Sequence, residues 1–300
     1  MKRKKIKWTT FDVVVWIIAT LAGVVTLYPM LYVVSCSISN PNMVTAGLVK
    51  LLPIGFSTKA YEIVMSDSVF WRSLINSVFY VVCNCILMLF TTIVVAYPLT
   101  RPDLKFRKIL TYYLLIPMYF GGGMIPSFLV VSKLGLYNSP LALILPSCFG
   151  IWNIILCRTF MASLPGELID SAMMDGCDQI KILWKIVTPL SKPVLAVIMI
   201  YTIVGVWNSW FSASIYTTHK EIQPVQLYLK NLMHVAGTAI TEEMLEGRTE
   251  EEIQALLEAS MSANQIKYAV IVLVTLPIIA VYPMFQKHFT KGMMLGSLKG

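Results

Sequence analysis

Residues that could carry out catalysis or bind a metal are few and scattered in this sequence. The six cysteines lack the paired spacing of a zinc site or a disulfide framework, and His219, His234 and His288 are isolated from one another. The sequence contains no His-Glu-x-x-His run, no Ser-His-Asp constellation and no Gly-x-x-x-x-Gly-Lys-Ser/Thr loop. It therefore predicts no catalytic, metal or cofactor site in this chain. The sequence does not support the hypothesis that the protein is a membrane enzyme.

The composition is typical of a chain in contact with lipid. Hydrophobic residues make up 57% of the sequence and charged residues only 13%, about half the share found in soluble proteins. The formal net charge of +8 would also fit nucleic-acid binding. The charges lie at the ends of apolar runs, however, so we expect membrane lipid rather than nucleic acid to be the partner.

Six apolar runs are long enough to cross about 30 Å of hydrocarbon as helices. The first run follows a basic N-terminus, but it is longer than the apolar core of a signal peptide and has no cleavage site, so we expect it to be retained. The sequence predicts an all-α integral membrane protein with one transmembrane domain over residues 1–300. The predicted spans are residues 13–34, 74–97, 109–131, 141–162, 194–216 and 268–285.

The distribution of charge predicts the orientation. Most Lys and Arg residues fall in 1–7, 101–108, 158–192 and 287–299, all on one face of the predicted spans. Because basic residues next to short loops resist translocation, we expect both termini and the loop 163–193 to be cytoplasmic. The acidic segment 217–267 is then extracellular, with a short helix expected around 242–259.

The interiors of the predicted spans carry no acid or lysine at their centres. Ion-coupled transporters commonly retain such groups at a cost of at least about 2.5–3.5 kcal/mol each. The sequence therefore disfavours an ion-driven carrier and leaves a uniporter or channel open. Pro117, Gly121–Gly123 and Pro126 interrupt the third span, so we expect that span to face the protein interior or a pathway, with a kink that only packs as the alternative.

The predicted cytoplasmic loop 163–193 has the pattern of two short helices joined by a turn. Glu167 suits a first helical turn, Gly176 can end that helix in a left-handed conformation, and Asp178 can cap the next helix. Pro189 is expected to end the second helix. A short amphipathic unit of this kind can lie on lipid headgroups or insert into a groove on a partner protein.

This loop resembles the "EAA" coupling loop of bacterial binding-protein-dependent ABC importers, whose pattern is Glu-Ala-Ala, three residues, Gly, nine residues, Ile-x-Leu-Pro. Here it reads Asp170-Ser171-Ala172, then Gly176, then Ile186-Val187-Thr188-Pro189. Asp, Ser and Thr depart from the pattern, but Asp keeps the charge of Glu on a shorter stem. The resemblance implies contact with an ATP-binding subunit through Glu167, Asp170, Ser171, Ala172, Asp175, Gly176, Ile186 and Pro189.

Nearly the whole chain is similar to maltose-type carbohydrate permeases, in the branch associated with complex oligosaccharides. The similar stretches are 118–126, 134–138, 205–211 and 292–300. The last implies a tail that reaches the ATPase dimer, as in the second maltose permease, with Gly292, Gly296, Lys299 and Gly300 at that contact. The resemblance further implies a bacterial plasma-membrane importer with a second permease, two ATP-binding subunits that hold ATP and Mg, and an extracellular sugar-binding lipoprotein.

Under this resemblance, a sugar pathway would use aromatic rings beside amides, because sugars present apolar C–H faces and hydroxyl edges. For Trp207 and Trp210 an interfacial anchor is the alternative role. A permease for an amino acid, phosphate or metal, or a standalone channel, remains an alternative function. The loop 217–267 is expected to contact the binding protein or to be a solvated acidic helix. The candidate pathway residues are Tyr119, Phe120, Asn153, Trp207, Asn208 and Trp210.

Overall fold

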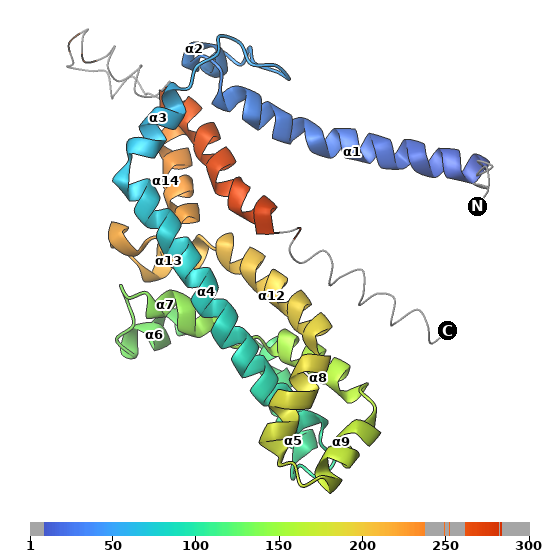
Figure 1. Cartoon of the computed structure of the whole chain (residues 1–300). Coiled ribbons are helices and arrows are strands. Elements are labelled where there is room, and N and C mark those ends of the chain that lie inside the picture. The colour runs from blue at the N-terminus through green and yellow to red at the C-terminus, as the bar shows by residue number, and fades with distance from the viewer. Residues whose placement is uncertain (1–8, 238–248, 250–251, 253–261, 282, 284–300) are drawn as a thin grey trace. The chain divides into compact units, whose positions relative to one another are not determined.

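The computed structural model describes residues 9–237, 249, 252, 262–281 and 283, and the regular elements among them are all helices (Figure 1). This confirms the all-α prediction. Three described helices are long and apolar enough to cross a membrane, and the number rises to six if each of three bent helix pairs is one span. The chain forms two compact units, one of Met1–Ser68 with Leu229–Thr275 and one of Val69–Tyr228 with Leu276–Gly300.

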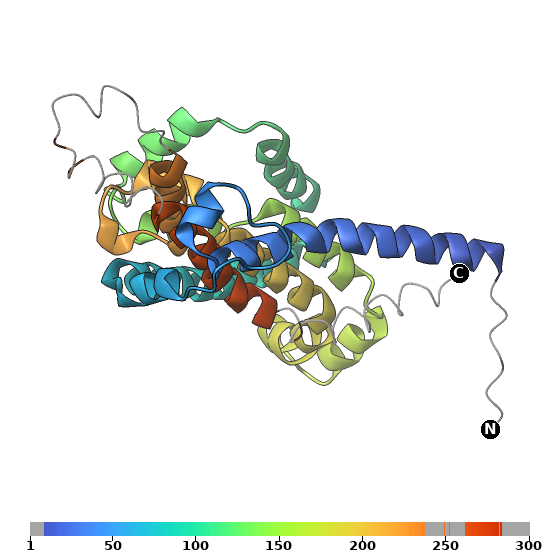
Figure 2. The same cartoon turned by 90° about the horizontal axis from the view of Figure 1, so that it is seen from above.

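The first unit begins with one long apolar helix, α1 (Thr10–Ser37), which Figure 2 shows as an unbroken rod. A capping box starts it: the Asp12 amide donates to Thr9 Oγ1 (3.3 Å) and the Thr9 amide donates to Asp12 Oδ2 (2.8 Å). None of residues 10–34 is buried. A helix that is apolar all round needs lipid or another helix around it.

The end of α1 packs inside its own unit through polar and aromatic contacts. The side-chain amide of Gln265 donates to the Ser39 carbonyl, and the rings of Tyr32 and Tyr268 meet edge to face at 6.0 Å. These contacts satisfy a fully buried amide and fix the last helix of the unit against the chain that follows α1. The other described helices of this unit are α2 (Pro41–Thr45), α3 (Lys59–Ser66), most of α14 (Val225–Gly237) and most of Ser262–Val281.

The second unit is built along α4 (Ser68–Ala96), whose buried residues recur every three or four positions. Polar members of this face, among them Ser77, Tyr80 and Asn84, stand beside apolar ones. The elements that follow in this unit are η1 (Pro98–Thr100), α5 (Arg107–Tyr119), α6 (Met124–Lys133), α7 (Leu141–Ile144), η2 (Leu145–Ser147), α8 (Ile151–Ala162), α9 (Gly166–Met174), α10 (Gln179–Ile182), η3 (Leu183–Val187), α11 (Thr188–Leu190), α12 (Lys192–Trp207), α13 (Phe211–Tyr216), η4 (Lys220–Ile222) and the first turn of α14.

Three predicted spans of this unit are not straight helices. α5 and α6 meet at 113°, and α7–η2 and α8 meet at 42°. A third bend, of 76°, lies between Gln179–Leu190, which belongs to the predicted cytoplasmic loop, and α12. The first break falls on the predicted glycine run, where Gly123 has a φ of +84° that favours glycine. Residues 194–216, predicted as one span, form α12 and α13 with a break after Trp207.

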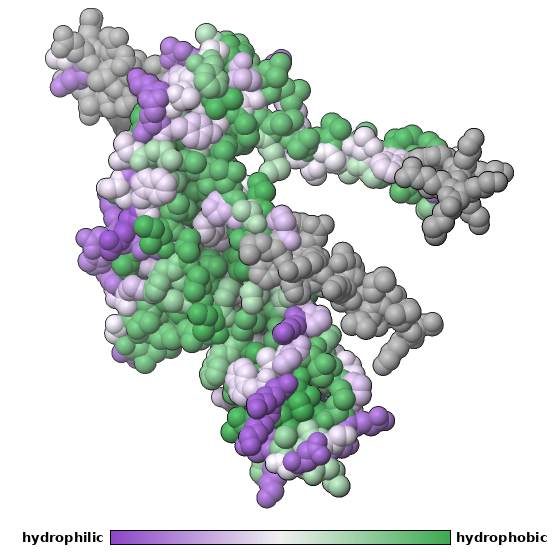
Figure 3. All heavy atoms as spheres, viewed as in Figure 1, coloured by the Kyte–Doolittle hydropathy of each residue, from purple (hydrophilic) through white to green (hydrophobic). Residues whose placement is uncertain are grey.

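One apolar cluster joins the C-terminal half of α4 to α8, α9, α10, η3 and α12. Ile154, Cys157, Ile182 and Ile198 are fully buried in it. Hydrophilic residues gather at the end of the unit that carries α5 and α9, whereas apolar residues dominate the surface along α4 (Figure 3). The loop between α8 and α12 is therefore anchored in the same core as the membrane helices.

Candidate functional site

The loop 163–193 folds as a helical hairpin whose inner face is apolar. In α9, Ile169 and Ala172 are buried and belong to the cluster shared with α4 and α8. Glu167 lies in the first turn of α9, where its charge complements the helix dipole. Asp170, Ser171 and Asp175 are exposed. Of the predicted coupling residues, Ala172 thus makes a core contact, whereas Asp170, Ser171 and Asp175 lie on a free surface.

A Schellman turn ends α9. The amide of Cys177 donates to the Ala172 carbonyl and the amide of Gly176 donates to the Met173 carbonyl, both at 3.0 Å. Gly176 has a φ of +78°, in the left-handed region predicted from the sequence. Asp178 then caps α10 by accepting from the Lys181 amide at 2.8 Å. The turn predicted from Gly176 and Asp178 is confirmed.

The second arm runs from Gln179 to Leu190, one residue beyond the predicted stop at Pro189. Its middle turn, η3, is a π-helix, in which the backbone hydrogen bonds join residues five apart rather than four. Val187 is buried and Ile186 is packed against the shared cluster. Of the two pattern positions in this arm, Ile186 therefore faces the core, whereas Pro189 is exposed.

The outer surface of the hairpin carries exposed apolar side chains, two of them beside the turn. Leu168, Met174 and Ile180 are exposed, and Met174 is 89% exposed. Acidic residues accompany them, and the sequence has no Lys or Arg between Arg158 and Lys181. Exposed apolar side chains beside acids suit a groove on a protein partner better than the anionic headgroups of a cytoplasmic leaflet.

Three side chains that sequence reasoning missed, Tyr97, Gln179 and Arg158, join the segment just after α4 to the hairpin and to α8. The Tyr97 hydroxyl donates to Gln179 Oε1 at 2.6 Å, and Gln179 Nε2 lies 3.5 Å from Met173 Sδ. Arg158 Nε, in α8, donates to the Leu99 carbonyl at 3.1 Å. No local pattern pairs Tyr97 with Gln179, because 82 residues separate them.

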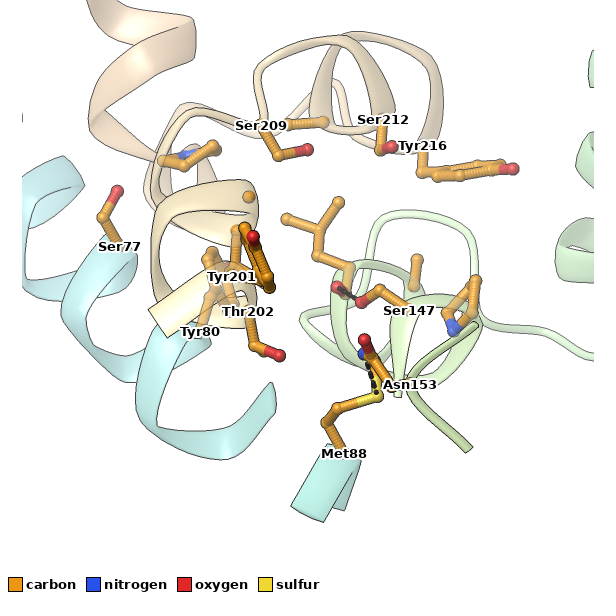
Figure 4. A pocket seen from close by; sticks show the side chains of 17 residues that line it. Ser77, Tyr80, Met88, Ser147, Asn153, Tyr201, Thr202, Ser209, Ser212 and Tyr216 are labelled. Carbon is orange, nitrogen blue, oxygen red and sulfur yellow. Dashed lines mark hydrogen bonds between the residues drawn. The ribbon is translucent and has the colours of Figure 1, made fainter. Parts of the chain in front are cut away.

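A second feature of this unit is a pocket of about 410 Å³ between α4, the α7–α8 region, α12 and α13 (Figure 4). Its volume lies near the lower end of the range of about 300–1,000 Å³ for small-molecule sites. Asn153 and Ser147 line one side, and Tyr201, Ser209 and Ser212 line the other. The pocket is thus rich in hydroxyl and amide groups.

Among the predicted pathway residues, Asn153 alone lines this pocket. Trp207 is 4% exposed, and Asn208 Oδ1 accepts from Gln226 Nε2 at 3.2 Å. Tyr119 and Phe120 are exposed at the α5–α6 break, and Trp210 packs edge to face on Phe211. The role of these five residues in a pathway stays a prediction.

The spacing of residues in the sequence could have pointed to part of the pocket lining, which residue type alone did not reveal. Tyr201 and Gly205 are four residues apart and lie on one side of α12, and Ser209 follows just after that helix ends at Trp207. Within the described part of the chain, no group of three or more His, Cys, Asp and Glu residues could hold a metal ion. The predicted tail contacts Gly292, Gly296, Lys299 and Gly300, and nearly all of the predicted helix 242–259, lie outside the described residues.

The fold and the hairpin define a transport permease of the ABC importer class. The chain belongs to the family described as "Binding-protein-dependent transport system inner membrane component", which matches residues 11–295. It is accordingly an inner-membrane subunit that works with other ABC components and a binding protein.

Similar proteins support this assignment. The chain is 38% identical over 278 residues to protein LplC of Bacillus subtilis (strain 168), covering 93% of this chain and 91% of that protein. It is 35% identical over 292 residues to the polygalacturonan/rhamnogalacturonan transport system permease protein YtcP of the same organism, covering 97% and 98%. A crystal structure of a bacterial ABC transporter involved in the import of the acidic polysaccharide alginate matches with a TM-score of 0.83 and 32% identity, covering 95% of this chain and all of that one.

Proposed function

We propose that this chain forms one half of the membrane pathway of an importer that takes up oligosaccharides. The other half is a second, homologous permease, and an extracellular lipoprotein delivers the sugar. The names of its relatives support a carbohydrate substrate, because YtcP is named for polygalacturonan/rhamnogalacturonan transport and the structural neighbour for import of the acidic polysaccharide alginate. Both termini of this chain face the cytoplasm in this proposal, as the distribution of Lys and Arg favours.

The observation that carries the proposal is the two-faced hairpin of α9 and α10. Its inner face is buried with α4 and α8, and its outer surface exposes Leu168 at the start of α9 and Met174 and Ile180 beside the turn. An exposed apolar surface with acidic neighbours fits a groove on an ATP-binding subunit. Glu167, Asp170, Ser171 and Asp175 lie on the docking side, where the loop pattern places the coupling contacts.

Coupling follows from the rigidity of this arrangement. Two partner subunits bind ATP and Mg, close on each other and carry the two docked hairpins with them. Because Ile169, Ala172 and Ile182 are packed into the core of the membrane helices, the hairpin moves these helices rather than sliding over them. The pathway then changes between inward-facing and outward-facing states as a rigid-body, two-state transition.

ATPase activity of the complete complex in lipid tests the proposal. The complex is assembled with its binding protein and challenged with oligosaccharides, amino acids, phosphate and metal ions. Stimulation by one class of oligosaccharide is expected. Stimulation only by amino acids, phosphate or metal ions would show that the substrate is one of these solutes and not a sugar. Solute flux through this chain without ATP-binding subunits would indicate a standalone channel.

The C-terminal tail is proposed to add a second contact with the ATP-binding subunits. Deleting 292–300, which removes Gly292, Gly296, Lys299 and Gly300, should lower the amount of ATP-binding subunit that co-purifies. Equal co-purification of the truncated and complete chains would contradict this role of the tail.

A further inference from the structure

The pocket between α4, α7–α8, α12 and α13 contains polar groups that the protein does not satisfy. Among the described residues, the hydroxyls of Tyr201, Ser209 and Ser212 have no hydrogen-bond partner. The side-chain amide of Asn153 has only a 3.3 Å contact from Nδ2 to Met88 Sδ, which leaves its oxygen free. Asn153, Ser209 and Ser212 are half-buried and Tyr201 is 61% exposed, so their free polar groups are open to a ligand or to ordered water.

Other groups in the pocket are held in place and can still accept a hydrogen bond. Ser147 Oγ donates to Asn84 Oδ1 at 2.6 Å, and Thr202 Oγ1 donates to the Ile198 carbonyl at 2.9 Å. Each of these hydroxyl oxygens keeps a lone pair for another donor. The pocket therefore combines free donors and acceptors with positioned acceptors, a combination that matches the hydroxyl groups of a sugar.

The pocket also supplies an aromatic face. Figure 4 shows the Tyr201 ring standing among Thr202, Ser209 and Ser147. Gly205 lies one turn from Tyr201 on the same side of α12 and adds no side chain to the space. An apolar ring face next to hydroxyl groups can take the C–H face of a pyranose while its edges are hydrogen-bonded.

The geometry points to a binding site in this subunit for an uncharged sugar unit of the transported oligosaccharide. This inference rests on the proposed import of oligosaccharides and adds both the site and the class of sugar. The residues that line the pocket are uncharged. A uronate would lose hydration of its carboxylate on entry and would gain no cation from these side chains, so neutral units bind more tightly.

Saturation-transfer NMR on the complete complex in lipid nanodiscs tests the site without the selectivity of the binding protein. The probes are a neutral hexose oligosaccharide and a uronate oligosaccharide of equal length. The neutral probe should show the stronger transfer. Tyr201→Phe, Ser212→Ala and Asn153→Ala should each weaken its binding by about fivefold, the effect of losing one hydrogen bond.

Ser214→Ala is the matched control. Ser214 lies next to the pocket on α13, but its hydroxyl donates to the Phe211 carbonyl at 2.7 Å and it does not line the pocket. Its substitution should leave binding unchanged. Equal binding of the two probes, or unchanged binding in all three pocket variants, would overturn the inference even if the complex imports sugars. If the complex with its binding protein takes up no sugar at all, the proposed function fails as well.

Discussion

Tyr97 at the C-terminal end of the α4 span donates a hydrogen bond of 2.6 Å to the side-chain oxygen of Gln179 in the first turn of α10. Tyr97 is only 4% exposed. The bond therefore joins the longest helix of the second unit directly to the hairpin that is proposed to receive the movement of the ATP-binding subunits. It is a specific link in addition to the apolar packing around it.

Tyr97→Phe should reduce the number of sugar molecules transported per ATP hydrolysed. The substitution keeps the ring in the core and removes only the hydroxyl, a loss of about 1 kcal/mol or roughly fivefold in an equilibrium. The measurement is the ratio of sugar uptake to phosphate release in proteoliposomes. Tyr112→Phe, in an exposed position on α5, is the control, and an unchanged ratio for Tyr97→Phe would count against a coupling role.

Gly176→Pro should uncouple ATP hydrolysis from uptake while the protein remains in the membrane. Gly176 has a φ of +78°, whereas proline fixes φ near −65° at a cost of about 3 kcal/mol and removes the amide that bonds to Met173. Gly166→Ala, within α9 and with no atom within 4 Å of an added Cβ, should leave uptake unchanged. Normal uptake by Gly176→Pro would refute the role assigned to the turn.

Met174→Asp should weaken association with the ATP-binding subunits by about tenfold, or roughly 1.4 kcal/mol. The side chain is 89% exposed, so the fold of this chain should not change, but a charge would have to enter an apolar groove. Co-purification and sedimentation of the detergent-solubilised complex measure the effect. Met174→Leu, which keeps the apolar surface, should assemble normally, and normal assembly of Met174→Asp would place the ATPase contact elsewhere.

Asn84→Leu should lower the free energy of unfolding by about 1–3 kcal/mol, because it removes a buried amide that has two partners. Asn84 is fully buried, donates to the Tyr80 carbonyl at 2.9 Å and accepts from Ser147 Oγ at 2.6 Å. Thermal unfolding of the purified subunit in detergent measures the change. Ser147→Ala completes a double-mutant cycle, and fully additive losses would show that the two residues are not energetically coupled.

Local sequence determined the features that depend on neighbouring residues. The apolar runs and sparse charges predict the membrane class, since the composition needed to face lipid is a property of each segment by itself. Gly176 and Asp178 predict the turn of the hairpin for a similar reason: a left-handed φ and an N-cap are decided within a few residues. The glycine run before α6 likewise predicts a break in its own segment.

Only the tertiary structure decided which side of each segment faces which neighbour. Leu168 and Ile169 are adjacent and both apolar, yet Ile169 is in the core and Leu168 is exposed, because the orientation of α9 is set by its packing against α4 and α8. The same holds for the bond between Tyr97 and Gln179 and for the pocket, whose lining comes from segments far apart in the chain. Contacts between distant segments depend on how all helices pack together, and no local pattern of residue types encodes that arrangement.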